Sequence, residues 1–230
     1  MRTERLLYVC LTFLLALAFA PPSQGQAPVP DKEYKLVNPP QKPESGKKIE
    51  VIEFFSYACP HCGEFEPTLQ GWVKRKPKDV VYKMVPMVFR ESWKAPAKLY
   101  YTLEIMGLVD RYHQKVYDAI NKDGKELFTD QAVKDWAKSA GIDPAKFSQV
   151  YDSFGIDAKL QRSVAMGKAY GIQFTPALAI NGKYWTGPSM ATAPEGGLDY
   201  NRFFKVVDQL IDMERGKPAP KKTSAPKKKP

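Results

Sequence analysis

Two cysteines, Cys59 and Cys62, are separated only by Pro60 and His61. Proline suits the first position of a helix, because its fixed φ fits a helix and its missing N–H would have no partner there. Cys59 would then be the N-cap residue, and both thiols would share a helix end. The unpaired amide donors and the positive dipole at such an end lower a thiol pKa and make the thiolate reactive. This spacing predicts redox chemistry.

The segments on either side are those needed to hold the pair in place. Apolar residues from 49 to 55 predict a buried strand that leads into the motif. The residues after it repeat at helical intervals on one face, which predicts an amphipathic helix. The residues of that face are Phe65, Leu69, Trp72 and Val73. We therefore expect a strand, a turn and a helix that begins at the cysteines.

A C-x-x-C pair has two other interpretations, half of a zinc site or two thiols without a shared role. Structural zinc sites take four ligands and generally combine two such pairs. This chain has one, and Cys10, His61 and His113 are its only other cysteine and histidines. We therefore favour redox chemistry over zinc and expect neither metal nor cofactor.

Glu53 lies within the predicted central strand, six residues before Cys59. Alternation along a strand places it on the same face as Val51 and Phe55, so it should be buried. A buried carboxylate needs a partner or its pKa rises. We expect Glu53 to exchange protons with a thiol beneath the helix, and Lys83, in the next strand, to be its counter-charge. The alternative is an acid at the frayed end of the strand.

The first 25 residues resemble a secretory signal. Arg2 and Arg5 precede an apolar run from 6 to 20 that is too short to span a bilayer comfortably. We favour cleavage after Gly25 over cleavage after Ala20, because prolines follow Ala20 directly. Cys10 would leave with the signal, so the exported chain would keep one cysteine pair. A single pair in an oxidising compartment indicates a catalytic role, and the alternative is one stapling disulfide.

The remaining chain alternates between strand-like and helical segments. Strands are predicted at 34–37, 49–55 and 80–85, and again at 174–180 and 183–186, joined there by the hairpin pair Asn181–Gly182. Between 93 and 170 the pattern is helical, with caps predicted at Thr129–Asp130 and Asp143–Pro144. A last amphipathic helix carries Leu198, Phe203, Val207, Leu210 and Ile211. This order indicates a helical insertion into an α/β domain.

The net charge of +10 is concentrated at the C-terminus, where residues 216–230 hold six lysines and no acid. Proline is too frequent in this tail for it to fold, so 214–230 should be disordered. A solvated tail is the simplest interpretation, and weak attraction to an anionic membrane surface or an acidic partner is the alternative. No aromatic residues alternate with the lysines, so we expect no nucleic-acid binding.

The stretch from Glu53 to Cys62, with Thr175–Pro176 and the segment 181–184, resembles the DsbA family of thiol:disulfide interchange proteins. The resemblance implies a thioredoxin-like α/β fold built from 26–89 and 172–213, with a helical insertion at 90–171. It implies a periplasmic enzyme that donates its Cys59–Cys62 disulfide to reduced exported proteins. A DsbB-like membrane protein would reoxidise it, and we expect a monomer.

By position, the resemblance makes Cys59 the nucleophile, Cys62 the resolving thiol and Glu53 the buried acid. Pro176 would be a cis-proline beside Cys59, and Thr175 would offer its backbone to an extended substrate. Pro60 and His61 complete the catalytic motif, since His61 should help to stabilise the Cys59 thiolate. Two rivals are a disulfide isomerase or reductase, and a non-enzymatic periplasmic metal carrier that uses the two cysteines and His61.

Overall fold

The computed structural model describes residues 27–193 and 196–216. The predicted signal segment, 1–25, and the predicted tail beyond residue 216 lie outside the described residues. Among the residues described, no helix combines the length and the apolar character needed to cross a bilayer.

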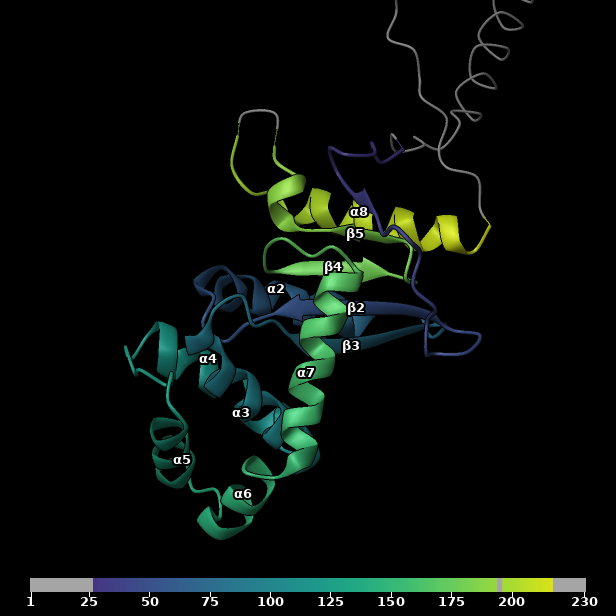
Figure 1. Cartoon of the computed structure of the whole chain (residues 1–230). Helices are drawn as coiled ribbons and strands as arrows, with labels where there is room; N and C mark the ends of the chain where they lie inside the picture. The colour runs from purple at the N-terminus through teal and green to yellow at the C-terminus, as the bar shows by residue number, and fades with distance from the viewer. Residues whose placement is uncertain (1–26, 194–195, 217–230) are drawn as a thin grey trace, which may run out of the picture. The chain divides into compact units, whose positions relative to one another are not determined.

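A five-stranded mixed sheet forms the centre of the fold (Figure 1). Its strands are β1 (Lys35–Leu36), β2 (Ile49–Phe55), β3 (Val80–Pro86), β4 (Ala177–Ile180) and β5 (Tyr184–Thr186), in the order β1-β5-β4-β2-β3. Only the β2–β3 pair is parallel, and β2 also pairs with β4 in antiparallel fashion. Segments far apart in the sequence therefore meet on both sides of β2.

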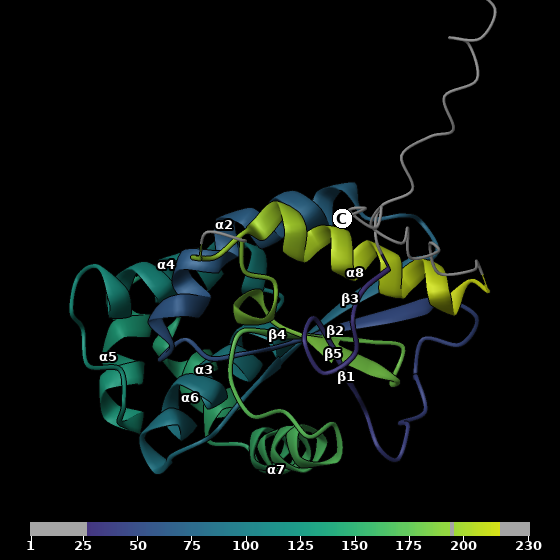
Figure 2. The same ribbon diagram turned by 90° about the horizontal axis from the view of Figure 1, so that it is seen from above.

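Every residue of β2 is buried, because helices cover both faces of the sheet (Figure 2). On one face Val51 packs in a core with residues of α2 (Pro60–Arg75) and α8 (Tyr200–Glu214). On the other face Ile52 and Phe54 belong to a core against which Met166 of α7 (Phe154–Ala169) packs. The near-continuous apolar sequence of β2 reflects this double burial.

The segment between β3 and β4 is helical, as predicted. It contains the 3-10 helix η2 (Glu91–Trp93) and the helices α3 (Lys94–Ile105), α4 (Val109–Asn121), α5 (Asp130–Ser139), α6 (Pro144–Tyr151) and α7. The predicted caps are present: the Thr129 hydroxyl accepts from the amide of Ala132, and the Asp143 carboxylate accepts from that of Lys146. The core of these helices includes Cys59 and Cys62, so this segment forms one wall of the cysteine site.

The predicted hairpin joins β4 to β5. Asn181 and Gly182 have φ values of +50° and +68°, the two positive values that a tight type I′ turn requires. A Cβ on Gly182 would lie 1.9 Å from the backbone oxygen of Gln41, so close packing also demands glycine here.

Two predicted boundaries were wrong. Leu198 does not belong to the last helix: Asp199 caps α8 by accepting from the amide of Arg202, which leaves Leu198 outside and half-exposed. The strand predicted from residue 174 begins only at Ala177. Pro176 has no N–H to donate to a strand ladder, so regular pairing starts after it.

Candidate functional site: the Cys59–Cys62 pair

Helix α2 begins as predicted, with Cys59 at its N-cap and Pro60 in its first turn. Both cysteines are free thiols, and the amide of Cys62 donates to the Cys59 carbonyl oxygen over 3.1 Å. Their surroundings differ, because Cys59 keeps 6% of its surface exposed whereas Cys62 has none. Only the first sulfur can be approached from outside.

The two thiols have opposite pKa shifts. The pKa of Cys59 is lowered to about 6, mainly by a hydrogen bond from Cys62, with smaller contributions from Thr175 and the backbone of Cys62 that together outweigh burial. Burial raises the pKa of Cys62 well above its ordinary value, and its hydrogen bond to Cys59 and the charges of Cys59 and Glu53 act in the same direction. At neutral pH Cys59 is therefore a thiolate and Cys62 a thiol.

His61 contributes little to this difference. Its ring lies on the surface, with its side chain 74% exposed, and Nδ1 is 3.4 Å from a carboxylate oxygen of Glu64. Its charge is the smallest of the named influences that lower the Cys59 pKa. The direction agrees with the sequence prediction, but Cys62 and Thr175 matter more.

The Thr175–Pro176 peptide bond is cis and lies beside Cys59, as predicted. The Cys59 sulfur is 3.5 Å from the backbone oxygen of Thr175, 116 residues further along the chain. The proline segment thus closes one side of the reactive thiol.

Glu53 is fully buried, but Lys83 is not its partner. The Tyr82 hydroxyl donates to Oε2 of Glu53, while Lys83 Nζ lies 2.5 Å from a carboxylate oxygen of Glu50. Neighbouring residues of a strand point to opposite faces, and Glu53 faces the α2 side with Tyr82. Glu50 and Lys83 share the other face, so the predicted counter-charge was wrong.

Without a cation beside it, Glu53 holds its proton. Its pKa is raised well above the ordinary value, chiefly by burial and also by the charge of Glu66, while the hydrogen bond from Tyr82 opposes both. Oε1 of Glu53 has no hydrogen-bond partner among the described residues. A protonated carboxyl at this position can donate a proton.

Sequence reasoning missed the remaining polar residues of this interior. Glu66 lies four residues after Cys62, so helical spacing alone places it on the same face of α2 as the buried thiol. Tyr57 and His113 are also buried, and the Tyr57 hydroxyl is 2.7 Å from Nδ1 of His113. No sequence signal joined His113, on α4, to this group, because the contact depends on how α4 packs.

Metal ligation is not supported by the geometry. Within 27–193 and 196–216, no three histidine, cysteine, aspartate or glutamate side chains are grouped so that they could hold a metal ion.

Comparison with known proteins agrees with this geometry. Residues 50–193 match the family model described as a DSBA-like thioredoxin domain. The chain belongs to the DsbA family.

Relatives in the DsbA family cover most of the chain. The thiol:disulfide interchange protein DsbA of Bordetella parapertussis is 43% identical over 197 residues, which are 86% of this chain and 90% of that protein. DsbA of Burkholderia cepacia is 35% identical over 90% of this chain and 96% of its own. The crystal structure of Pseudomonas aeruginosa DsbA superposes with a TM-score of 0.75 at 34% identity, over 82% of this chain and 95% of that one. The predicted thioredoxin-like fold of the DsbA family is thus confirmed.

Proposed function

We propose that this chain is a thiol:disulfide oxidoreductase that donates its Cys59–Cys62 disulfide to reduced exported proteins. The observation that carries the proposal is the pair of opposite pKa shifts, downward for Cys59 and upward for Cys62. A stable thiolate is a good leaving group, so a low pKa at Cys59 favours the reduced enzyme and makes the disulfide a strong oxidant. DsbA is itself among the established examples of this relation.

The exchange proceeds in two displacements. A substrate thiolate attacks Cys59, the bond to Cys62 breaks, and Cys62 leaves with the electron pair and takes up a proton. A second substrate thiolate then attacks the substrate sulfur of the mixed disulfide and releases Cys59 as a thiolate. The substrate loses two electrons to the enzyme disulfide. Its exposure makes Cys59 the attacked sulfur, while the buried Cys62 acts only within the protein.

Glu53 and the proline segment would serve this reaction in different ways. Protonated Glu53 is the group that would supply the proton to Cys62, since its own pKa is raised and its ionised form raises the pKa of Cys62. Thr175, beside the Cys59 sulfur, would bind the backbone of an extended substrate as an edge strand binds a peptide. Pro176 would hold that segment in place.

The location and the reoxidation partner follow from family membership together with the signal-like N-terminus. We place the mature protein in the periplasm and assign its reoxidation to a DsbB-like membrane protein.

A trapping experiment tests the proposal. In Cys62→Ser no internal thiol can release a bound substrate, so mixed disulfides on Cys59 should accumulate in periplasmic extracts, whereas Cys59→Ser should trap none. The wild-type protein should also reactivate a reduced, denatured protein that needs disulfides. Strong insulin reduction without oxidative refolding would indicate a reductase or isomerase instead. Stoichiometric metal in the purified protein with neither activity would indicate a metal carrier.

A further inference from the structure

The proton that Cys62 requires must come from inside the protein. Neither Cys62 nor Glu53 has any exposed surface, so neither can exchange protons with bulk water directly. Each turnover consumes one proton at Cys62 and each reoxidation releases one. Glu53 must therefore be reprotonated through another group that leads to solvent.

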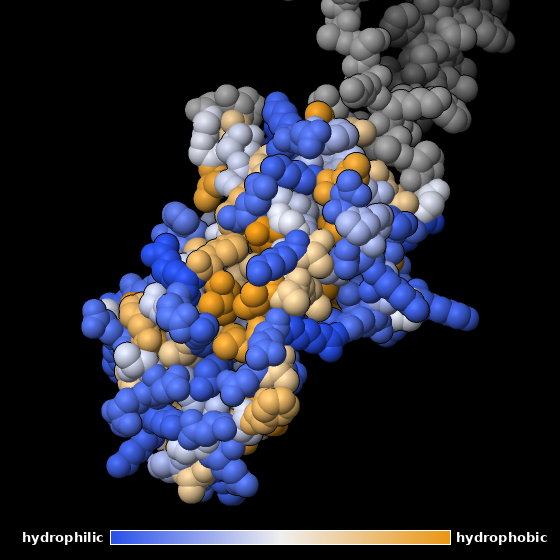
Figure 3. Space-filling view, viewed as in Figure 1, coloured by the Kyte–Doolittle hydropathy of each residue, from blue (hydrophilic) through white to orange (hydrophobic). Residues whose placement is uncertain are grey.

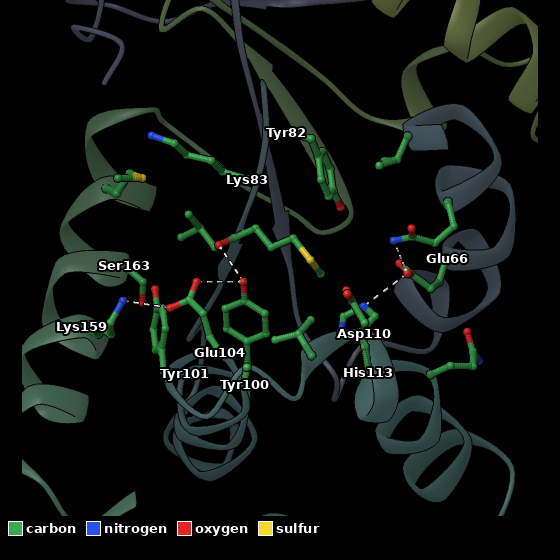
Figure 4. Close-up of a pocket in the computed structure, with 18 of the residues that line it drawn as sticks. Glu66, Tyr82, Lys83, Tyr100, Tyr101, Glu104, Asp110, His113, Lys159 and Ser163 are labelled. Carbon is green, nitrogen blue, oxygen red and sulfur yellow. Dashed lines mark hydrogen bonds and ion pairs between the residues drawn. The ribbon is translucent and has the colours of Figure 1, made fainter. Parts of the chain in front are cut away.

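A pocket of about 970 Å³ lies on the side of α2 that carries Glu66. It is lined by β3 and by residues of α2, α3, α4 and α7, among them Glu66 and His113 (Figure 4). On the face seen in Figure 1, Figure 3 shows hydrophobic side chains gathered near the middle, with hydrophilic ones around them. The apolar lining residues are Val73, Met84, Val85, Val109 and Met166. Buried polar side chains in a pocket with this apolar lining need a reason to be there.

Glu66 and His113 connect this pocket to the interior. His113 Nε2 lies 3.4 Å from Oε1 of Glu66, and both side chains are more than nine-tenths buried (Figure 4). Oε2 of Glu66 and Nε2 of His113 have no hydrogen-bond partner among the described residues. The charge of Glu66 also raises the pKa of Glu53. The unpartnered atoms of Glu66 and His113 thus belong to two adjacent residues that line the pocket.

Tyr57 fixes the ring of His113 without blocking proton transfer. Its hydroxyl is 2.7 Å from Nδ1 and is able to donate or accept, so both protonation states of the imidazole keep this contact. Nε2 then remains free to exchange a proton. Other titratable side chains near the ring are Tyr117, which packs against it, and Asp110, Tyr82 and Tyr100, which line the same pocket.

We infer that His113 is the solvent end of a proton route that runs through Glu66 and Glu53 to the sulfur of Cys62. When the Cys59–Cys62 bond breaks, Cys62 takes a proton from Glu53. Glu53 recovers it through Glu66 from Nε2 of His113, and His113 takes up a proton from the pocket that it lines. Reoxidation reverses every transfer. His113 does not touch the reacting sulfur atoms and acts only through the two carboxyl groups. This role rests on the proposed function.

The test compares two residues of the same helix, α4. His113→Gln keeps a polar side chain but cannot relay a proton, and Lys122→Gln is the control, because Lys122 caps the end of α4 with its side chain 71% exposed. Oxidised protein is mixed with excess reduced peptide, and the single-turnover rate is followed by the absorbance of the Cys59 thiolate. We expect His113→Gln to react about tenfold more slowly or worse at neutral pH and Lys122→Gln to react like the wild type.

A second measurement separates a relay from a structural role. A relay changes the rate but not the end states, so the equilibrium constant with glutathione should be the same in His113→Gln and the wild type. Added imidazole should restore the reaction rate of His113→Ala, in proportion to the fraction of the imidazole that is protonated. Slow reaction with a shifted equilibrium constant and no rescue would overturn the inference.

Folding failure does not leave the question open. If neither His113 variant folds, Glu66→Gln must show the same slow reaction at an unchanged equilibrium constant, and a wild-type rate in that variant overturns the route. If wild-type protein oxidises the peptide and the variants match it at every pH, only the relay is wrong. Wild-type protein that fails to oxidise the peptide overturns the proposed function as well.

Discussion

The lowered pKa of Cys59 predicts that reduction stabilises this protein, and that acid removes the advantage. Only the reduced form has a Cys59 that can ionise. Its pKa falls from an ordinary value near 9 to about 6 on folding. An acid whose pKa is depressed in the folded state gains stability as the pH rises from the folded value to the unfolded one. Three pKa units at about 1.4 kcal/mol each give a full effect of about 4 kcal/mol.

Only part of this effect is available at neutral pH. At pH 7 about one unit, or about 1.4 kcal/mol, is present, and at pH 8 about two units are present, or about 2.7 kcal/mol. Below the folded pKa of about 6 it vanishes. The raised pKa of Cys62 has no effect in this range, because it costs stability only above the ordinary thiol value. The disulfide closes so short a loop that it stabilises the oxidised form little.

The assay is denaturant unfolding of both redox forms between about pH 5 and pH 8. We expect the free energy of unfolding of the reduced form, minus that of the oxidised form, to rise by about 2 to 3 kcal/mol across this range. Reduced Cys59→Ser should lack the increment. A difference that stays constant with pH, or an oxidised form that is the more stable at pH 7, would refute the thiolate argument.

Three further substitutions test individual contacts. Glu53→Gln removes an acid whose raised pKa destabilises the folded state above about pH 4. The free energy of unfolding of the variant should therefore exceed that of the wild type by about 1 to 3 kcal/mol at pH 7, and this gain should disappear in acid. The variant should also exchange disulfides more slowly. Equal stability at pH 7 would contradict this. Gly187→Ala would place a Cβ 2.5 Å from the Phe174 ring and 2.9 Å from the Pro176 oxygen, which should cost about 1 to 3 kcal/mol and raise the Cys59 pKa in a thiolate titration. Gly155→Ala, with 3.7 Å of clearance, is its control, and matching titrations of the two would exclude the effect. Lys83→Met leaves the buried Glu50 without its cation, so the free energy of unfolding measured in urea should fall by about 1 to 3 kcal/mol while the rate of disulfide exchange stays unchanged. A slower exchange would show that Lys83 does contribute to the redox site.

Local signals made much of this fold predictable. The range 49–55 coincides with β2, and the start of α2 follows from proline and cysteine alone, because chain-local chemistry decides where a helix begins. The hairpin at Asn181–Gly182 follows in the same way from its turn residues.

Contacts between elements were harder to predict. The sequence predicts Lys83 as the counter-charge of Glu53 because Lys83 lies in the next strand. The parallel register, however, aligns Lys83 with Ile52 and Met84 with Glu53. The Lys83 side chain therefore points to the face of the sheet opposite to Glu53. His113 could not be placed at all, since the packing of α4 against α2 is set by many apolar side chains together. Charged partners in a core are thus decided by register and packing rather than by residue type.

The pairing of β2 with β4 also determines at which stage of folding the redox site is assembled. Cys59 meets Thr175 across 116 residues, and the whole helical segment is synthesised between them. Contacts over such separations form late, because the intervening loop must first be closed. During synthesis, Cys59 and Cys62 are therefore present well before the segment that carries Thr175. Until β4 joins the sheet, Cys59 lacks the Thr175 contact that helps to lower its pKa.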